Sequence, residues 1–420
     1  MDQGNTAWIL VSAALVLLMT PALAFFYGGL VKTKSVVSMM MLSFGSLALI
    51  GVTWVLYGYA IAFPASGSTS FIGIPHVIGI DTAELGLHSL LTIPDGAKYP
   101  PLAFAAFQGG FAIITVALIS GAIADRAKFG AWLVFAFIWS TIVYFPVANW
   151  VFNFTVDSTG KMIDGGWLVY NVGVIDFAGG TAVHIAAGSA GLALAIVLGK
   201  RIGFAKGVDK PHNVPLVMLG AGLLWFGWFG FNAGSELAAD GIAATAFINT
   251  MAAPAAAILG WLLVERIKDG KATSVGAASG AVAGLVAITP ACAVLTPVWA
   301  IVLGLLAGAV CALAIELKFK WGFDDSLDVV GIHLIGGIVG TLFIGIFATG
   351  VGLVESGSWD QFGKQALGAF SVLIFSFVLS FIIGTIIEKT MGFRIKNEDE
   401  LAGIDTSVHG EEGYAMEMAK

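Results

Sequence analysis

Two histidines lie where an ionisable side chain is least expected, inside long apolar stretches of the chain. They are His184 and His333, and each begins the same H-x-x-x-G-x-x-G spacing. A neutral imidazole carries one donor and one acceptor nitrogen, and desolvation in apolar surroundings penalises its charged form. Two such rings could therefore pass a small hydrogen-bonding molecule, or a proton, along a lumen. The simpler alternative is that each ring donates to a backbone carbonyl and only ties two helices together.

The sequence gives little support for metal, redox or hydrolytic chemistry. No cysteine or carboxylate cluster accompanies the two histidines, which makes them a poor metal cage. Cys292 and Cys311 both lie in apolar runs, which argues against a disulfide framework or a thiolate metal site. A hydrolase built on His184 and Asp176 would lack a nucleophile at triad-like spacing. We therefore expect no enzymatic activity, no metal and no cofactor.

An aspartate stands upstream of each histidine, Asp176 before His184 and Asp328 before His333. A buried carboxylate at Asp176 could supply a field that attracts a cation at the entrance of a pathway. It could also cap the backbone amides of residues 179–181. We favour the capping role, with the electrostatic effect as a by-product.

Aromatic and polar side chains form a second set at helical spacing. The set comprises Phe107 and Phe111 in one apolar stretch and Trp228, Phe231, Asn232 and Ser235 in another. Each aromatic face holds a cation with roughly 0.5 to 2 kcal/mol, and a serine hydroxyl can accept a hydrogen bond. Such stripes are more often lipid or packing contacts, so their spacing alone is a weak indication of a cation site.

The cost of desolvating a cation, compared with the free energy of its aromatic contacts, decides what such a site could do. Moving an ammonium-sized ion into a low dielectric costs on the order of 20 kcal/mol in the idealised limit and several after relaxation. Two or three aromatic contacts offset at most about 4 to 6 kcal/mol. A small cation can therefore be selected at a pore mouth, but it cannot cross a narrow apolar lumen as a bare charge. A weakly acidic cation can shed its proton and cross as a neutral molecule.

The elements that position these residues must lie in a membrane. Of the 420 residues, 58% are hydrophobic and 11% are charged, with a mean hydropathy of +0.92, whereas soluble domains carry about 25% charged residues. The net charge of −7 includes no basic block, so a nucleic-acid partner is not expected.

Eleven stretches are long enough for membrane helices. They run over about 8–31, 38–63, 100–124, 130–152, 174–199, 214–235, 242–265, 274–291, 297–317, 329–351 and 363–389. With alternate connections assigned to the cytoplasm, 17 of the 20 lysines and arginines fall inside, including Lys206 and Lys420. The remaining three are Lys98, Lys161 and Lys364. The sequence thus predicts an all-α polytopic membrane protein with its N-terminus outside and its C-terminus inside.

The repeated histidine spacing falls in the fifth and tenth stretches, which run in opposite directions. This predicts two inverted five-helix halves, about 8–199 and 214–351, with an eleventh helix appended and a site between the halves. We divide the chain into a transmembrane domain, 1–391, and a cytoplasmic tail, 392–420. The tail contains seven acidic and three basic residues, so it contributes −4 of the net charge. Composition alone would predict its acidic end to be disordered.

At these residues the chain resembles the ammonium transporter family (Amt/Mep/Rh), prokaryotic Amt type. The motifs that carry the resemblance are Asp176-Phe-Ala-Gly-Gly-Thr-Ala-Val-His184, Trp225-Phe-Gly-Trp228-Phe-Gly-Phe231-Asn-Ala-Gly-Ser235, Phe107-Gln-Gly-Gly-Phe111, Gly199-Lys-Arg-Ile-Gly203, Thr289-Pro-Ala-Cys292 and Asp328-Val-Val-Gly-Ile-His333. The resemblance implies a homotrimer in the plasma membrane with one pore per subunit. It also implies an outer ammonium site at Ser235 with aromatic walls, a gate of Phe111 and Phe231, and a pore lined by the histidine pair.

One position departs from the family pattern. The family usually has a tryptophan at the outer cap just after the fourth span. Here Trp150 and Phe152 are followed by about a dozen extra residues before Trp167. Matching from the left places Phe152 at the cap, while matching by the glycine pair Gly165-Gly166 leaves Trp167 nearby. The cap is therefore open among these three residues.

The tail also resembles the family's C-terminal region, through Gly392-Phe-Arg394, Gly403-Ile-Asp405 and Ser407-Val-His409-Gly410. That resemblance implies packing beneath the trimer and regulation by a cytoplasmic PII-type (GlnK-like) protein.

The expected function is transport of ammonium, with methylammonium as an analogue: recruitment outside, deprotonation at the gate, and passage of ammonia past the histidines. The alternatives are an ammonium sensor of the same fold that signals through its tail, and a channel for a neutral gas or urea.

Overall fold

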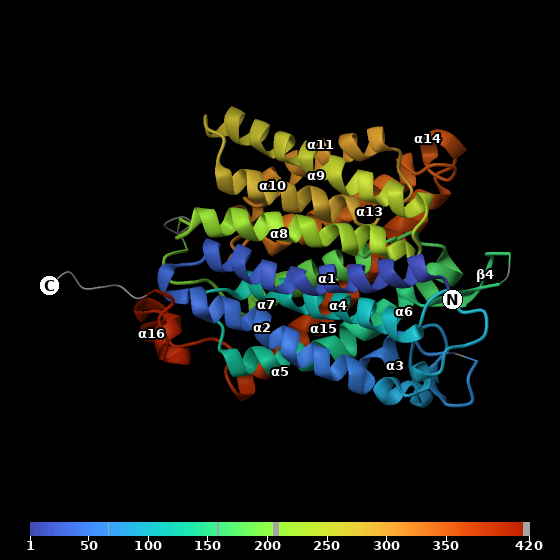
Figure 1. Cartoon of the computed structure of the whole chain (residues 1–420). Coiled ribbons are helices and arrows are strands. Elements are labelled where there is room, and N and C mark those ends of the chain that lie inside the picture. Colours follow the sequence, from blue (N-terminus) through green and yellow to red (C-terminus); the bar gives the residue numbers. More distant parts are fainter. Residues whose placement is uncertain (66, 158, 205–209, 415–420) are drawn as a thin grey trace.

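The computed structural model of the chain is a bundle of helices that run side by side (Figure 1). It describes residues 1–65, 67–157, 159–204 and 210–414. Two expected cytoplasmic lysines, Lys206 and Lys420, and the end of the acidic tail from 415 lie outside the described residues. Both β-hairpins lie at one end of the bundle, and the tail lies at the other.

The helices and strands have the following bounds. The α-helices are α1 Gln3–Leu30, α2 Val36–Thr53, α3 Tyr59–Ala62, α4 Pro101–Ile119, α5 Phe129–Trp139, α6 Phe145–Phe152, α7 Ala186–Leu198, α8 Val214–Ala233, α9 Gly241–Lys268, α10 Ser274–Ile288, α11 Pro297–Ala314, α12 Leu317–Trp321, α13 Ile335–Phe347, α14 Leu353–Ser356, α15 Asp360–Thr390 and α16 Asn397–Ala402. The 3₁₀ segments are η1 Thr33–Ser35, η3 Thr82–Leu87, η4 Ser89–Leu91, η5 Ser120–Ile123 and η10 Gly234–Glu236. The π-helical segments are η2 Trp54–Gly58, η6 Ser140–Tyr144, η7 Trp167–Val172, η8 Gly180–Ile185, η11 Val330–Leu334 and η12 Asp405–His409. The antiparallel hairpins pair β1 Phe71–Ile74 with β2 Ile78–Asp81, and β3 Phe154–Val156 with β4 Met162–Gly165.

The apolar stretches predicted from the sequence correspond to these helices. In the described part of the chain, ten helical segments are long and apolar enough to cross a membrane, and α10 is a shorter apolar helix. The fifth stretch was predicted to be helical from 174, but its helix begins at Gly180. The preceding residues are held in a non-helical turn by Asp176, and Gly179 adopts a left-handed φ of 116°.

Glycines bring α9 into close contact with α10 and α11. An added methyl group at Gly304 or Gly308 would lie 2.1 Å from the carbonyl oxygen of Ala253 or Ala257 on α9. Gly284 of α10 meets the side chain of Ala257 in the same way, at 2.5 Å. The G-x-x-x-G spacing in the sequence thus corresponds to close helix packing, as expected for membrane helices.

The tail folds against the end of the bundle opposite the hairpins. The carboxylate of Asp405 accepts hydrogen bonds from the amides of Val37 (3.0 Å) and Ser38 (2.7 Å), at the start of α2. Glu400, 5% exposed, accepts from Arg394 at 2.7 Å. The described part of the tail, residues 392–414, is therefore an ordered strap. The disorder that composition alone predicts for its acidic end stays a prediction, because residues 415–420 lie outside the described part.

Candidate functional site

Both histidines occupy π-helical turns at the start of long apolar helices. His184 lies in η8, which continues into α7, and His333 lies in η11, which continues into α13. A π-helical turn inserts one extra residue per turn, and such bulges are frequent at functional sites. The repeated histidine spacing in the sequence is therefore accompanied by the same π-helical turn in both backbone segments.

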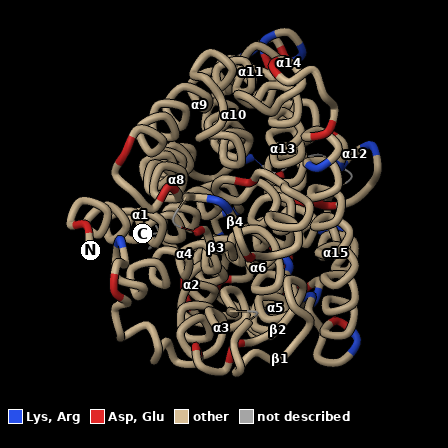
Figure 2. Tube along the Cα trace, turned by 90° about the vertical axis from the view of Figure 1, so that its right-hand side faces the viewer, with Lys and Arg blue, Asp and Glu red and all other residues tan. Residues whose placement is uncertain are grey.

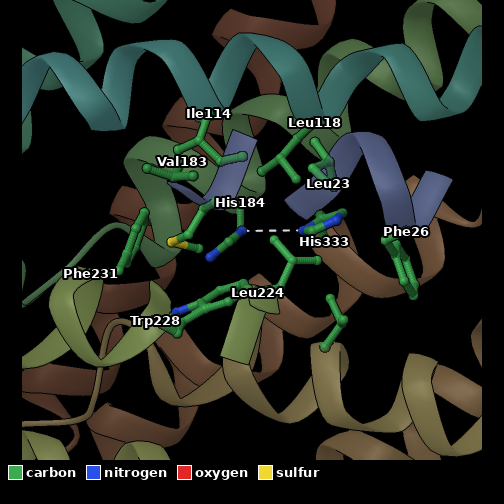
Figure 3. A pocket seen from close by; sticks show the side chains of 12 residues that line it. Leu23, Phe26, Ile114, Leu118, Val183, His184, Leu224, Trp228, Phe231 and His333 are labelled. Atoms are coloured by element: carbon green, nitrogen blue, oxygen red, sulfur yellow. Dashed lines mark hydrogen bonds between the residues drawn. The ribbon is translucent and has the colours of Figure 1, made fainter. Parts of the chain in front are cut away.

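The two imidazoles meet in the centre of the bundle (Figure 3). Their Nδ1 atoms are 3.2 Å apart, and the rings lie nearly parallel with centroids 5.3 Å apart. For this contact one Nδ1 must donate and the other accept. If both rings are neutral, one Nε2 is then an acceptor and the other a donor. The pair thus presents complementary hydrogen-bonding atoms along a line.

The surroundings of the pair are closed and apolar. His184 and His333 are only 1% and 3% exposed, and Nε2 of His184 has no partner among the described residues. The cavity beside them is lined by aliphatic and aromatic side chains, including Leu23, Ile114 and Leu224 (Figure 3). It leaves about 10 Å³ for the centre of a water-sized molecule, which is close to the space that one such molecule needs.

Glycines at equivalent positions let the two histidine helices touch. A methyl group added at Gly188 would lie 2.5 Å from the backbone nitrogen of Leu334. One added at Gly337 would lie 3.0 Å from the carbonyl oxygen of Gly180 and 3.3 Å from Cβ of His184. The first glycine of each H-x-x-x-G spacing therefore packs against the opposite histidine segment.

This packing predicts a marked cost for Gly188→Ala. The added methyl group meets backbone rather than a movable side chain, so α7 and η11 must separate, and overpacking of this kind costs about 1 to 3 kcal/mol. Thermal unfolding in detergent should show a lower midpoint than wild type. Gly222→Ala is the matched control, because no atom lies within 4 Å of its added methyl group and alanine favours a helix. An unchanged midpoint for Gly188→Ala would contradict the packing argument.

Two phenylalanines stack on each other on the hairpin side of the histidines. The rings of Phe111 and Phe231 stack with centroids 4.1 Å apart at 25°. Phe231 lies 6.2 Å from the ring of His184, and Trp228 stacks on that imidazole at 5.5 Å. Phe107 contacts Phe111 edge-on at 4.9 Å. The predicted aromatic set and the histidine pair thus form one continuous column.

The polar residues of this set have defined partners. Ser235, in η10 just after α8, donates its hydroxyl to the carbonyl of Phe231 at 2.8 Å and so keeps its lone pairs available. Asn232 is fully buried and donates to Thr250 at 3.0 Å, while Trp228 donates to Thr289 at 2.8 Å. Neither threonine was assigned a role from the sequence: Thr250 is a lone threonine in an apolar helix, and Thr289 appeared only as part of the motif Thr289-Pro-Ala-Cys292.

The three cap candidates separate clearly in space. Phe152, the last residue of α6, meets Phe111 edge-on with ring centroids 6.0 Å apart. Trp150 and Trp167 contact each other at 5.6 Å, and Trp150 also contacts Phe375 of α15 at 4.7 Å. The structure therefore brings Phe152 to the aromatic column and leaves the two tryptophans packed together beside α15.

Asp176 organises the start of the His184 segment. Its carboxylate accepts hydrogen bonds from the amides of Gly179 (2.8 Å), Gly180 (2.6 Å), Thr181 (2.8 Å) and Ala182 (3.2 Å), and also from the Thr181 hydroxyl. Backbone amides at a helix start favour a negative group. The geometry is that of a buried cap.

The counterpart of this cap in the second half is Asp325, which the sequence argument missed. Its carboxylate accepts from the amides of Val329 (3.1 Å) and Val330 (2.7 Å) at the start of η11. Asp328, the aspartate singled out from the sequence, instead pairs with Lys318 at 2.6 Å. A signal was present, because Asp325 precedes His333 by eight residues, as Asp176 precedes His184.

Asp325 gives the protein a predicted pH dependence. Burial raises the pKa of this carboxyl to about 6, with Asp328 adding to the rise and Lys318 and the two amides opposing it. An unfolded aspartate titrates near 3.9, so the folded state binds more protons between about pH 4 and 6. Stability therefore falls as the pH rises through this window, by up to about 3 kcal/mol. The unfolding midpoint of wild type minus that of Asp325→Asn should decrease from pH 4 to 6 and level off above 7; a constant difference would contradict this.

Comparisons with known proteins identify the family of the chain. A model of the Ammonium Transporter Family matches residues 7–414. An ammonium transporter of Mycobacterium bovis is 53% identical over 439 residues, which cover 100% of this chain and 91% of the relative. One of Bacillus subtilis is 44% identical over 429 residues, with 100% of both chains covered.

Solved structures agree as well. Saccharomyces cerevisiae Mep2 has a TM-score of 0.86 and 34% identity, and the match covers 100% of this chain and 93% of that chain. A protein described as a Sensor Amt Protein has a TM-score of 0.86 and 29% identity, covering 97% and 98% of the two chains. The family match includes both the aromatic column and the histidine pair. The chain therefore belongs to the ammonium transporter family and is a multi-pass protein of the cell membrane.

Proposed function

We propose that the chain transports ammonium by recruiting the cation outside, deprotonating it at the Phe111–Phe231 gate and passing ammonia along the histidine pair into the cytoplasm. The observation that carries this proposal is the continuous column from Phe107 to His333, with a stacked aromatic pair above two touching imidazoles. Ammonia, like water, is small enough for the narrow cavity beside these rings.

The recruitment site of the proposal is the hairpin end of the column. Ser235 accepts a hydrogen bond from the ammonium ion, and Phe107, Phe111 and Phe152 supply aromatic faces. Trp228, expected in the same site, instead lines the cavity beside the histidines and stacks on His184. The edge-on contact of Phe152 with Phe111 supports Phe152 as the cap. Asp176 acts indirectly, because its carboxylate is committed to hydrogen bonds inside the protein. Asn232 also acts indirectly, as a fully buried residue whose Nδ2 donates to Thr250.

The gate follows from the free energies of a charge in apolar surroundings. Past Phe231 the ion enters a narrow cavity lined by mainly aliphatic side chains, with Trp228 and Phe26 as its further aromatic residues. Desolvation still costs several kcal/mol there, so loss of the proton at the gate is the lower-energy route. The histidine nitrogens then replace the hydrogen bonds that ammonia loses.

The membrane arrangement of the proposal has eleven spans, with α10 as the short eighth. The basic residues of the connections at the tail end support a cytoplasmic tail and an outer N-terminus. We divide the chain into a transmembrane domain, 1–391, with inverted halves 8–199 and 214–351, and a regulatory tail, 392–420. The matched π-helical turns and aspartate caps of the two halves support the inversion.

The assembly of the proposal is a homotrimer with one pore per subunit. Its tail lies at the cytoplasmic face, where a PII-type protein of the GlnK kind would act. Support for a regulatory tail comes from its defined contacts with the start of α2 and with the segment after α7.

The decisive experiment is uptake of labelled methylammonium by proteoliposomes, with the ammonium-dependent current recorded in parallel. We expect saturable uptake that ammonium competes away, and strong loss of uptake in Phe231→Ala. Saturable uptake without current would restrict the proposal to net ammonia conduction. Passage of urea, together with unchanged methylammonium uptake in Phe231→Ala, would overturn it in favour of a channel for neutral molecules.

An ammonium sensor is the second candidate. The ordered strap of the tail and the similarity to a protein described as a sensor favour it. The two functions separate in the same assay, because a sensor binds methylammonium without catalysing its net uptake.

A further inference from the structure

An apolar groove lies on the outside of the bundle near its tail end, away from the pore. It is formed by the last turns of α7, by α12 and by the start of η11 and α13, and it has a volume of about 540 Å³. Figure 2, which looks along the bundle, places α12 at the edge opposite α1. The lining side chains are mainly aliphatic, among them Leu192, Ala195, Ile196, Leu317 and Leu334.

The rim of the groove is basic and aromatic. Lys200, two residues after α7, lines it, and its ammonium lies over the Phe204 ring, 5.7 Å from the ring centroid. It has no carboxylate partner among the described residues. Trp321, the last residue of α12, is 67% exposed at the same rim. Exposed tryptophan and lysine side chains at the ends of membrane helices are typical of the lipid–water interface.

The one carboxylate that lines the groove is already neutralised. Asp324 accepts hydrogen bonds from Nε and Nη2 of Arg201, both at 2.9 Å, and from the Arg201 amide at 2.7 Å. These guanidinium contacts hold the pKa of Asp324 below its usual value against the effect of burial. The free charge at the rim is therefore the positive charge of Lys200.

We propose that this groove binds an anionic phospholipid of the tail-side leaflet, with an acyl chain along α7 and α12 and the phosphate at Lys200. The aliphatic lining of the groove matches the acyl chain of the lipid. The ammonium of Lys200, which has no carboxylate partner among the described residues, matches the phosphate of the headgroup. Ile196, 47% exposed, places the opening of the groove toward lipid rather than toward the protein core. The proposal does not depend on the transport mechanism, since no residue of the pore column lines the groove.

Native mass spectrometry of the full chain in detergent tests it, with dioleoyl phosphatidylglycerol titrated against dioleoyl phosphatidylcholine. Lys200→Gln should weaken the first binding step for phosphatidylglycerol about fivefold and leave phosphatidylcholine binding unchanged. Ile196→Trp, which fills the groove and keeps the lysine, should weaken both lipids. Lys271→Gln, an exposed lysine in the loop after α9, is the matched control and should change neither.

Three outcomes would overturn the proposal. If the two lipids bound equally well to wild type and to Lys200→Gln, Lys200 would not contact the headgroup. Binding of glycerophosphoglycerol, which lacks acyl chains, with the affinity of the intact lipid would indicate a free phosphate site. A change in oligomeric state in Ile196→Trp, with lipid binding unaffected, would show that a second copy of the chain occupies the groove.

Discussion

Replacing both His184 and His333 with leucine should reduce methylammonium uptake at least about 30-fold. The two imidazoles are the polar side chains that line the cavity, and each hydrogen bond that a buried polar molecule fails to make costs about 1 to 3 kcal/mol. Two lost hydrogen bonds raise the barrier by about 2 to 6 kcal/mol, which corresponds to at least about 30-fold in rate. Leucine has a size similar to histidine, so the aromatic gate and the helix packing should stay in place.

A second variant separates hydrogen bonding from proton transfer. With glutamine at both positions the lumen keeps donors and acceptors, but it loses groups that can take up a proton near neutral pH. If the histidines only replace hydrogen bonds, this variant keeps most of the uptake. If they also relay the proton, uptake and current diverge. His88→Gln, an exposed loop histidine, serves as the control, and wild-type uptake in the leucine variant would refute a role for the pair.

The extent of prediction from the sequence differs between the fold and the site. Helix positions follow from composition, because a stretch of about 20 apolar residues has few alternatives to a membrane helix. The pairing of His184 with His333 also follows, since the shared spacing with glycine implies related helices. The glycines then act as the spacing suggests, by removing the side chain that would hold the two backbones apart.

Other features carry no local pattern in the sequence. The π-helical turns at both histidines depend on packing between the halves, since neither segment contains a proline or other residue that demands them. The separation of Phe152 from Trp150 and Trp167 depends on how α6 ends, which residue types alone leave open. Asp325 was missed for a different reason: Asp328 lies closer to His333 in sequence, yet only the carboxylate eight residues away reaches the amides that start the helix.

Replacing Asp176 with alanine should have the largest effect on stability of any single change in the site. The side chain is 9% exposed and accepts hydrogen bonds from four amides and one hydroxyl. Its removal leaves buried donors without partners, for which losses of about 3 to 5 kcal/mol are typical when a buried charged group is involved. Asp176→Asn keeps one acceptor oxygen and should lose about half as much. The unfolding midpoint in detergent measures both.

An ordinary, exposed helix cap serves as the control for Asp176→Ala. Asp240 caps α9 through the amides of Ile242 (2.9 Å) and Ala243 (3.1 Å) in an exposed position. Asp240→Ala should therefore cost about 1 kcal/mol. Because Asp176 caps the start of η8, the segment that contains His184, Asp176→Ala should also lower uptake per folded molecule, whereas Asp240→Ala should not. Equal losses of stability in the two variants would show that Asp176 is only a cap like any other, and would leave the alignment of the histidine pair to the glycine contacts between α7 and η11.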